Sequence, residues 1–150
     1  MEGNNYRKFF LMLVVSFVIM YTVMFLNVFM IDHVYLSLTR LYMTLLMVSP
    51  MALMMLLFMS GMYKNKQMNL SIGIGSVVVF ILTLTLLRTQ TFVGDEQYMQ
   101  AMIPHHSSAI LTSTNADLKD PEVKKLAEGI IDAQKREIAE MKQILARMKK

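Results

Sequence analysis

Three long apolar runs dominate the first part of the chain. Residues 9–31, 41–63 and 70–87 contain no charged side chain, and short polar segments separate them. Because about 20 apolar residues cross a hydrocarbon core about 30 Å thick, each run predicts a transmembrane helix. The first run is longer than the apolar part of a signal peptide, and no small-residue cleavage site follows it. The pattern therefore predicts a three-span membrane region at 1–88 with an uncleaved first span.

The second run contains a proline and is dense in methionine. Pro50 removes an amide from the helix and leaves a carbonyl without its usual partner, which the hydroxyl of Ser49 is placed to satisfy. Seven methionines fall within an arc of about 160° on a helix: Met43, Met47, Met51, Met54, Met55, Met59 and Met62. Ordinary apolar packing explains such a stripe, and conduction of a soft cation along the thioethers is the alternative. The absence of Asp, Glu, Lys and Arg from all three runs argues against transport by this chain alone.

The last part of the chain changes to the pattern of amphipathic helices. After a linker at 89–94, Asp95 is expected to cap a helix that continues to about Ser113. Asp120, Pro121 and Glu122 form a second helix start, and apolar positions recur at helical spacing from there almost to Lys150. Residues 95–150 are therefore predicted to form a helical hairpin, and the fold class is an all-α membrane protein.

Charge is distributed unevenly and predicts an orientation. Residues 1–88 hold eight charged side chains, six of them basic, whereas residues 89–150 hold eighteen, nine of each sign. Four basic residues flank one side of the predicted spans, namely Arg7, Lys8, Lys64 and Lys66, and only Arg40 and Arg88 flank the other. The positive-inside rule then places the amino terminus inside a bacterial cytoplasmic membrane and the hairpin in the periplasm or outside the cell. The formal net charge of +4 belongs to these flanks and gives no reason to expect nucleic acid as a partner.

The potential chemistry of the chain is concentrated between Met99 and His106. On a helix, Met99, Met102 and His106 fall within roughly 60° of one another, with His105 on the flank. The chain has no cysteine, so a soft-metal site must use thioethers and imidazoles. These ligands suit Cu(I) or Ag(I), and Cu(II) through the imidazoles. The alternative without a metal is that the methionines are core residues and the histidines are their polar neighbours.

Polar residues on the second predicted helix point to the same site. Gln134 and Glu137 interrupt its apolar stripe and lie within about 40° of Met141. Polar groups in such a seam usually have a partner or a metal. A hairpin sets this face against the first helix, where Asp95, Gln134 or Glu137 is expected to hold the second nitrogen of a histidine. Glu137 is also an expected metal ligand, because Glu137 or Asp95 could bind Cu(II) directly. His33, in the loop on the same side, is a tentative further ligand, although a histidine without a metal role is the more common case.

The two predicted helices resemble one known family in the spacing of their residues. The matching positions are Asp95-x-x-Tyr98-x-x-x-Met102-Ile-Pro-His105-His106, then Asp120-Pro-Glu, then Gln134-x-x-Glu137-x-x-x-Met141. This pattern is similar to the ferritin-like domain of unknown function numbered three hundred and five, which includes the CopM-type copper-binding proteins. The resemblance covers about residues 95–145. It implies an extracytoplasmic helical module for copper or silver tolerance, with metal ligands at Met102, His105, His106 and Met141.

This chain departs from the family pattern in two respects. Ser107 and Ser108 stand where the family usually has Gln-Gly, and Thr112 stands where a further methionine is usual. Many relatives also carry two copies of the helix pair, which together form a four-helix bundle. The resemblance therefore implies that this hairpin is half of such a bundle and that a homodimer or higher oligomer completes it.

Taken together, these features predict a membrane-anchored copper-binding protein and not an enzyme. The protein is expected to sequester Cu(I) at the outer side of the bilayer or to pass it to a metal efflux partner. No Ser or Cys nucleophile with a base and no nucleotide-binding Gly-rich loop occurs in the sequence. The alternative is a structural or assembly subunit, in which the spans bind a partner membrane protein and the hairpin is its docking surface.

Overall fold

A computed structural model describes residues 2–148, with side chains from residue 4 onward. Within that range the chain forms helices and no strand, which confirms the predicted all-α class. The helices are α1 (Glu2–Val23), the 3-10 helix η1 (Ile31–His33), α2 (Leu38–Phe58), α3 (Lys66–Thr89), α4 (Asp95–Asn115) and α5 (Pro121–Met148). Residues 149 and 150 of the predicted hairpin lie outside the described residues.

The chain divides into two compact units that are not contiguous in sequence. The three-helix unit comprises Met1–Thr22 and Thr39–Thr91, and the hairpin unit comprises Val23–Leu38 and Phe92–Lys150. The connection between α1 and α2 therefore belongs with the hairpin, whereas the hydropathy pattern placed it in a membrane region at 1–88. Each unit is described by itself below.

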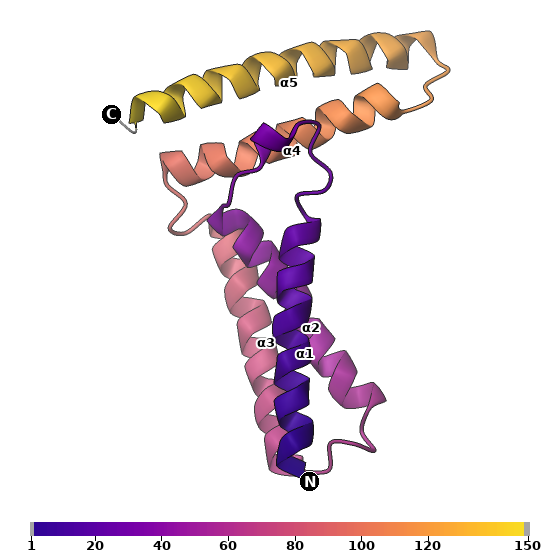
Figure 1. Cartoon of the computed structure of the whole chain (residues 1–150), viewed down its shortest axis with the longest axis vertical. Coiled ribbons are helices and arrows are strands. Elements are labelled where there is room, and N and C mark those ends of the chain that lie inside the picture. The colour runs from indigo at the N-terminus through magenta and orange to yellow at the C-terminus, as the bar shows by residue number, and fades with distance from the viewer. Residues whose placement is uncertain (1, 149–150) are drawn as a thin grey trace. The chain divides into compact units, whose positions relative to one another are not determined.

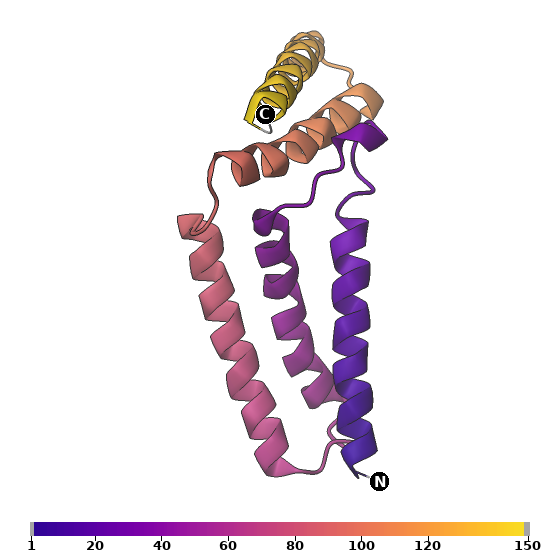
Figure 2. The same cartoon turned by 60° about the vertical axis from the view of Figure 1, so that its left-hand side comes forward.

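The three-helix unit contains three helices that are long and apolar enough to cross a membrane. These segments are Asn4–Val23, Leu38–Phe58 and Lys66–Thr89. Figure 2 shows that the chain direction alternates from α1 to α2 to α3. A core cluster joins Tyr6 and Phe9 of α1 to Ala52 of α2 and to Tyr63 in the following turn. The ring of Tyr63 lies 5.4 Å from that of Tyr6 and 5.3 Å from that of Phe9, and the Phe9 contact is edge-to-face.

The ends of these helices differ from the ends of the apolar runs. Helix α1 begins at Glu2 and ends at Val23, whereas the first run predicted a helix over 9–31. The rest of that run leaves the helix and is attached to α4 by polar contacts of Asn27 and of the amide of Phe29, while several of its apolar side chains stay exposed. Helix α2 ends at Phe58, before Ser60 and Gly61, which are weak helix formers. Met59 and Met62 of the predicted methionine stripe therefore lie in a turn and not on the helix.

Polar side chains form hydrogen bonds with otherwise free backbone groups at two points in the three-helix unit. Pro50 lies inside α2, and the hydroxyl of Ser49 donates to the carbonyl of Leu46 at 3.3 Å. That carbonyl is the one left free by the missing amide of Pro50, so the predicted role of Ser49 is confirmed. At the start of α3, the side chain of Asn65 accepts from the amide of Met68 at 3.0 Å. This N-cap starts α3 at Lys66, four residues before the apolar run begins.

The hairpin unit is built on the contact between α4 and α5. The two helices run antiparallel and side by side (Figure 1). Their shared core contains five buried residues: Met99, Ile103, Ile110, Ile138 and Leu145. The carboxylate of Asp120 accepts from the amides of Glu122 and Val123 at 2.8 and 3.0 Å, which confirms the predicted start of α5. At α4 the predicted cap is wrong, because the N-cap residue is Gly94 and Asp95 is in the first turn, where its charge favours the helix dipole.

The segment 23–38 is attached to the hairpin by polar contacts. The hydroxyl of Ser107 on α4 accepts from the amide of Phe29 at 2.7 Å and lies 2.8 Å from Nδ1 of His33. Next to it, the side-chain amide of Asn27 donates to the hydroxyl of Ser108 at 3.0 Å. On α5, the ammonium of Lys142 donates to the carboxylate of Asp32 at 2.6 Å. Ser107 is fully buried and His33 is only 6% exposed, so the contact between these two residues is sheltered from water, whereas the contacts of Asn27 and Asp32 are exposed.

The buried histidine makes the stability of the hairpin unit depend on pH. Burial lowers the pKa of His33 below its ordinary value of 6.5, and the charge of Lys142 lowers it further, against an opposing effect of Asp32. As the pH falls below 6.5, the unfolded chain binds a proton at His33 that the folded chain does not bind. The free energy of unfolding therefore decreases through that range. We predict that thermal unfolding followed by circular dichroism shifts to lower temperature between about pH 7 and pH 5.

The variant His33→Gln tests this prediction, because glutamine retains a partner for Ser107 and does not titrate. Its melting temperature should vary less over the same pH range. The pKa of Asp32 is lowered below its ordinary value of 3.8, with the hydrogen bond from Lys142 as the largest cause. The stabilisation that ionised Asp32 provides is therefore lost only at a pH below the range of this test, so it does not affect the comparison of the two proteins. If the melting temperatures of the unmutated protein and of His33→Gln changed equally with pH, this would contradict the prediction that His33 is buried in its neutral form.

Candidate metal centre

A groove between α4 and α5 brings together most of the residues that the sequence singled out. Its volume is about 550 Å³. Six predicted site residues line it: Asp95, Met99, Met102, His106, Glu137 and Met141. The hairpin thus places the face of α4 that carries thioethers and an imidazole opposite the polar interruption in the apolar stripe of α5.

His106 is held in one orientation by the turn of helix that precedes it. Its Nδ1 lies 2.9 Å from the backbone carbonyl oxygen of Met102. A carbonyl oxygen only accepts, so Nδ1 carries the proton and donates it. In the neutral ring the lone pair is therefore on Nε2. A backbone carbonyl that fixes the tautomer in this way is a usual partner of a metal-binding histidine.

The Nε2 atom of His106 faces α5 and pairs with a carboxylate. It lies 2.7 Å from Oε2 of Glu137, which is a hydrogen-bonding distance. The orienting role that the sequence offered to Asp95, Gln134 or Glu137 falls instead to the carbonyl of Met102. Glu137 meets His106 at the nitrogen that would bind a metal. Glu137 is therefore placed to compete with a metal for Nε2 or to bind the metal itself. The other ring nitrogen, Nδ1, contacts the carbonyl of Met102 and not Glu137.

Four methionines line the same groove as His106, namely Met99, Met102, Met141 and Met148. Met99 is 6% exposed and belongs to the hairpin core, whereas Met102 and Met141 are partly buried. Met99 therefore belongs both to the hairpin core and to the groove. For this residue, packing in the core and a place at the candidate site do not exclude each other. The rim carries the acidic residues Asp95, Glu137 and Glu140 and the basic residue Arg147. This excess of acidic groups favours cations near the thioethers.

Three other predicted residues lie apart from this groove. His105 is exposed, and its ring centre is 6.2 Å from that of His106. Gln134 is partly buried on α5 and is not among the residues that line the groove. His33 contacts Ser107 and lines a separate pocket with Asp32 and Lys142. The structure thus brings His106 to the thioethers and places its two fellow histidines elsewhere.

The donor set limits which metals the groove suits. Within residues 2–148 no group of three or more His, Asp and Glu side chains is positioned to hold a metal ion. The groove itself is lined by one imidazole and by methionine thioethers, which are the ligand types that soft monovalent ions prefer.

Sequence reasoning missed several residues that the structure makes relevant. Tyr98, Glu140, Arg147 and Met148 also line the groove. Met148 recurs seven residues after Met141, and this spacing on one helix face was the available signal. Nothing local indicated the role of Ser107, because its partners lie in the segment 23–38.

Comparison with known proteins agrees with the resemblance seen in the two helices. Residues 83–150 match the family described as "Domain of unknown function (DUF305)". The chain is also 39% identical over 145 residues to "Uncharacterized protein L153" of Acanthamoeba polyphaga mimivirus, and the alignment covers 94% of this chain and 93% of that protein. No solved structure matches the chain. The chain therefore belongs to the same family as this mimivirus protein, and its residues 83–150 carry a DUF305 domain.

Proposed function

We propose that this protein is a membrane-anchored copper-binding protein that holds Cu(I) in the groove between α4 and α5. The observation that carries the proposal is the orientation of His106. Its Nδ1 contacts the carbonyl of Met102, and its Nε2 contacts Glu137 in the groove that the thioethers also line. His106 and the three methionines Met99, Met102 and Met141 would hold the ion. Ag(I) has the same ligand preference, and Cu(II) is the alternative through nitrogen and oxygen.

Cu(I) and a proton compete for the same lone pair in this arrangement. Without metal, Nε2 lies 2.7 Å from the carboxylate of Glu137. Copper binding requires that any proton on Nε2 leaves and that the carboxylate moves aside or joins the metal. The backbone contact at Nδ1 is unaffected by this exchange, so the ring does not have to reorient.

The proposed location follows from the charges at the two ends of the three-helix unit. The side chains of Asn5 and Tyr6 bond to Met62 and Asn69, which joins the ends that carry Arg7, Lys8, Lys64 and Lys66. Arg40 and Arg88 belong to the opposite helix ends. We propose that the helices cross a cytoplasmic membrane with the more basic end inside. Residues 92–150 then lie outside, where the protein sequesters copper or passes it to an efflux partner.

Replacing His106 tests the copper site directly. We predict that His106→Gln and the double variant Met102→Leu with Met141→Leu each weaken Cu(I) binding by about ten-fold or more. Leucine keeps the apolar packing while removing the sulfur. The measurement is competition with a chromophoric Cu(I) chelator under reducing conditions, with the full-length protein in detergent.

The neighbouring histidine provides the matched control. His105→Gln removes an exposed imidazole beside the groove and should change Cu(I) affinity much less than His106→Gln. Equal losses for the two variants would contradict the assignment of His106 as the principal ligand. Chelator competition that is identical for the unmutated protein and all variants would remove the copper function and favour the docking-subunit alternative.

Glu137 separates the two oxidation states of copper. Its carboxylate is a hard ligand that suits Cu(II) better than Cu(I). We predict that Glu137→Gln weakens Cu(II) binding severalfold and leaves Cu(I) binding unchanged or slightly stronger, because the competing carboxylate is gone. Titrations in air and under reducing conditions give both affinities. A comparable loss of Cu(I) affinity would show that Glu137 is a structural part of the Cu(I) site.

We further propose that a second copy of the chain completes a four-helix bundle. Helix α5 leaves Val123, Leu126 and Ile130 exposed by 45, 64 and 36%, and an apolar stripe of this kind is usually covered. We predict that Leu126→Glu reduces chemical cross-linking between chains in detergent severalfold. Gln143→Glu, an exposed position on the same helix with the same change in charge, should not. If the unmutated protein, Leu126→Glu and Gln143→Glu were all monomers, this result would contradict the proposal.

A further inference from the structure

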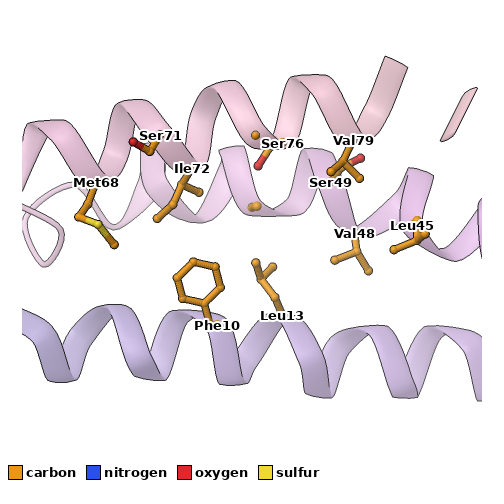
Figure 3. Close-up of a pocket in the computed structure, with 12 residues that line it drawn as sticks. Phe10, Leu13, Leu45, Val48, Ser49, Met68, Ser71, Ile72, Ser76 and Val79 are labelled. Atoms are coloured by element: carbon orange, nitrogen blue, oxygen red, sulfur yellow. The ribbon is translucent and has the colours of Figure 1, made fainter. Parts of the chain in front are cut away.

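The three-helix unit contains an apolar groove that the copper function does not use. Its volume is about 370 Å³, and all three helices contribute to its lining. Figure 3 shows Phe10 and Leu13 of α1 directed toward Ile72 and Val79 of α3 across the space between the helices. Small residues on α3, among them Gly75, leave space on that helix's side of the groove. The volume lies in the range of ligand-binding clefts, and most of the surface is apolar.

The groove has the length of one half of a bilayer. Along α3 it extends from Met68 to Val79, which at 1.5 Å per residue is about 16 Å. One leaflet of a hydrocarbon core about 30 Å thick has nearly the same depth. A groove of this length that begins at the end of the span is therefore matched to a single lipid acyl chain.

The end of the groove marked by Phe10 and Met68 lies next to a cluster of cations. Arg7 and Lys8 precede Phe10 on α1, and Lys64 and Lys66 precede Met68. Hydrogen bonds hold these two parts of the chain together, because the hydroxyl of Tyr6 donates to Oδ1 of Asn69 at 2.8 Å. Residues 1–22 and 39–91 contain one acidic residue, Glu2. The four cations are exposed and outnumber it, so this end of the unit carries a net positive charge.

We propose that this groove binds one anionic phospholipid, with an acyl chain along α1 and α3 and the phosphate headgroup against the four cations. Basic clusters between membrane helices on the inner side bind such headgroups. A helix from a second copy is a poorer occupant. In the same membrane orientation it brings the same four cations to the same end, where like charges repel. The proposal goes beyond copper binding and depends only on the proposed insertion of the three helices into a bilayer.

The test uses full-length protein in vesicles of phosphatidylcholine and phosphatidylglycerol. Flotation with the vesicles first establishes insertion. Electron paramagnetic resonance then measures how much of a spin-labelled lipid is immobilised by the protein, separately for labelled phosphatidylglycerol and labelled phosphatidylcholine. We expect immobilised phosphatidylglycerol to exceed immobilised phosphatidylcholine about five-fold or more.

Two variants examine the two parts of the site. Gly75→Leu fills the groove, because a Cβ at Gly75 meets no atom within 4 Å and the substitution causes no backbone clash. It should abolish the immobilised signal of both lipids, whereas Val78→Leu, which is 56% exposed and outside the groove, should not. Lys64→Gln with Lys66→Gln should remove only the preference for phosphatidylglycerol. Lys124→Gln with Lys125→Gln, the same loss of charge in the hairpin unit, should leave that preference intact.

Each contrary result overturns the proposal. Immobilised lipid that survives Gly75→Leu would place the lipid elsewhere. A preference that survives the loss of Lys64 and Lys66 would reject the headgroup site. Absence of immobilised lipid together with cross-linking between α3 helices would assign the groove to a second copy. Failure to float would reject the lipid site and the membrane anchor, while chelator competition would still decide the copper function independently.

Discussion

The packing of α4 against α5 is the interaction on which the candidate site depends. Ile103 and Ile110 on α4 are almost completely buried, as are Ile138 and Leu145 on α5. Full burial of each such side chain contributes about 1.5–3 kcal/mol. This contact sets the register in which Met102 and His106 face Glu137 and Met141. A shift by one turn along either helix would move the imidazole away from the carboxylate and the thioethers, so the core fixes the chemistry as well as the fold.

The same helix α4 uses a different face to hold the connection between α1 and α2. Ser107 receives the amide of Phe29 and contacts His33, and Lys142 of α5 reaches Asp32. A fully buried hydroxyl must have partners to offset its desolvation, and these partners come from a segment about 80 residues earlier in the sequence. Segment 23–38 therefore folds as part of the hairpin unit even though most of its residues are apolar.

The sequence predicted the number and type of helices well because composition and periodicity report burial directly. The caps at Asp120 and the pairing of Ser49 with Leu46 were also predictable, because both depend on residues within one turn of each other. The end of α1 was not predictable, because the segment that follows it is attached to Ser107 and Ser108 by hydrogen bonds between residues far apart in the sequence. For His33 the sequence left open a metal role and the more common role without a metal, and its partner Ser107 is a long-range contact that no local pattern indicates.

The position of Ser107 next to His106 relates the two faces of α4. Successive residues on a helix are about 100° apart, so the turn that directs His106 into the groove also directs Ser107 toward segment 23–38. The hydrogen bond from Nδ1 of His106 to Met102 belongs to the same turn. One short stretch of helix thus supplies a metal-ligand candidate, the carbonyl that orients it and the anchor for the connecting segment. A substitution at Ser107 is consequently expected to act on the groove through the backbone of this turn, although its side chain does not line the groove.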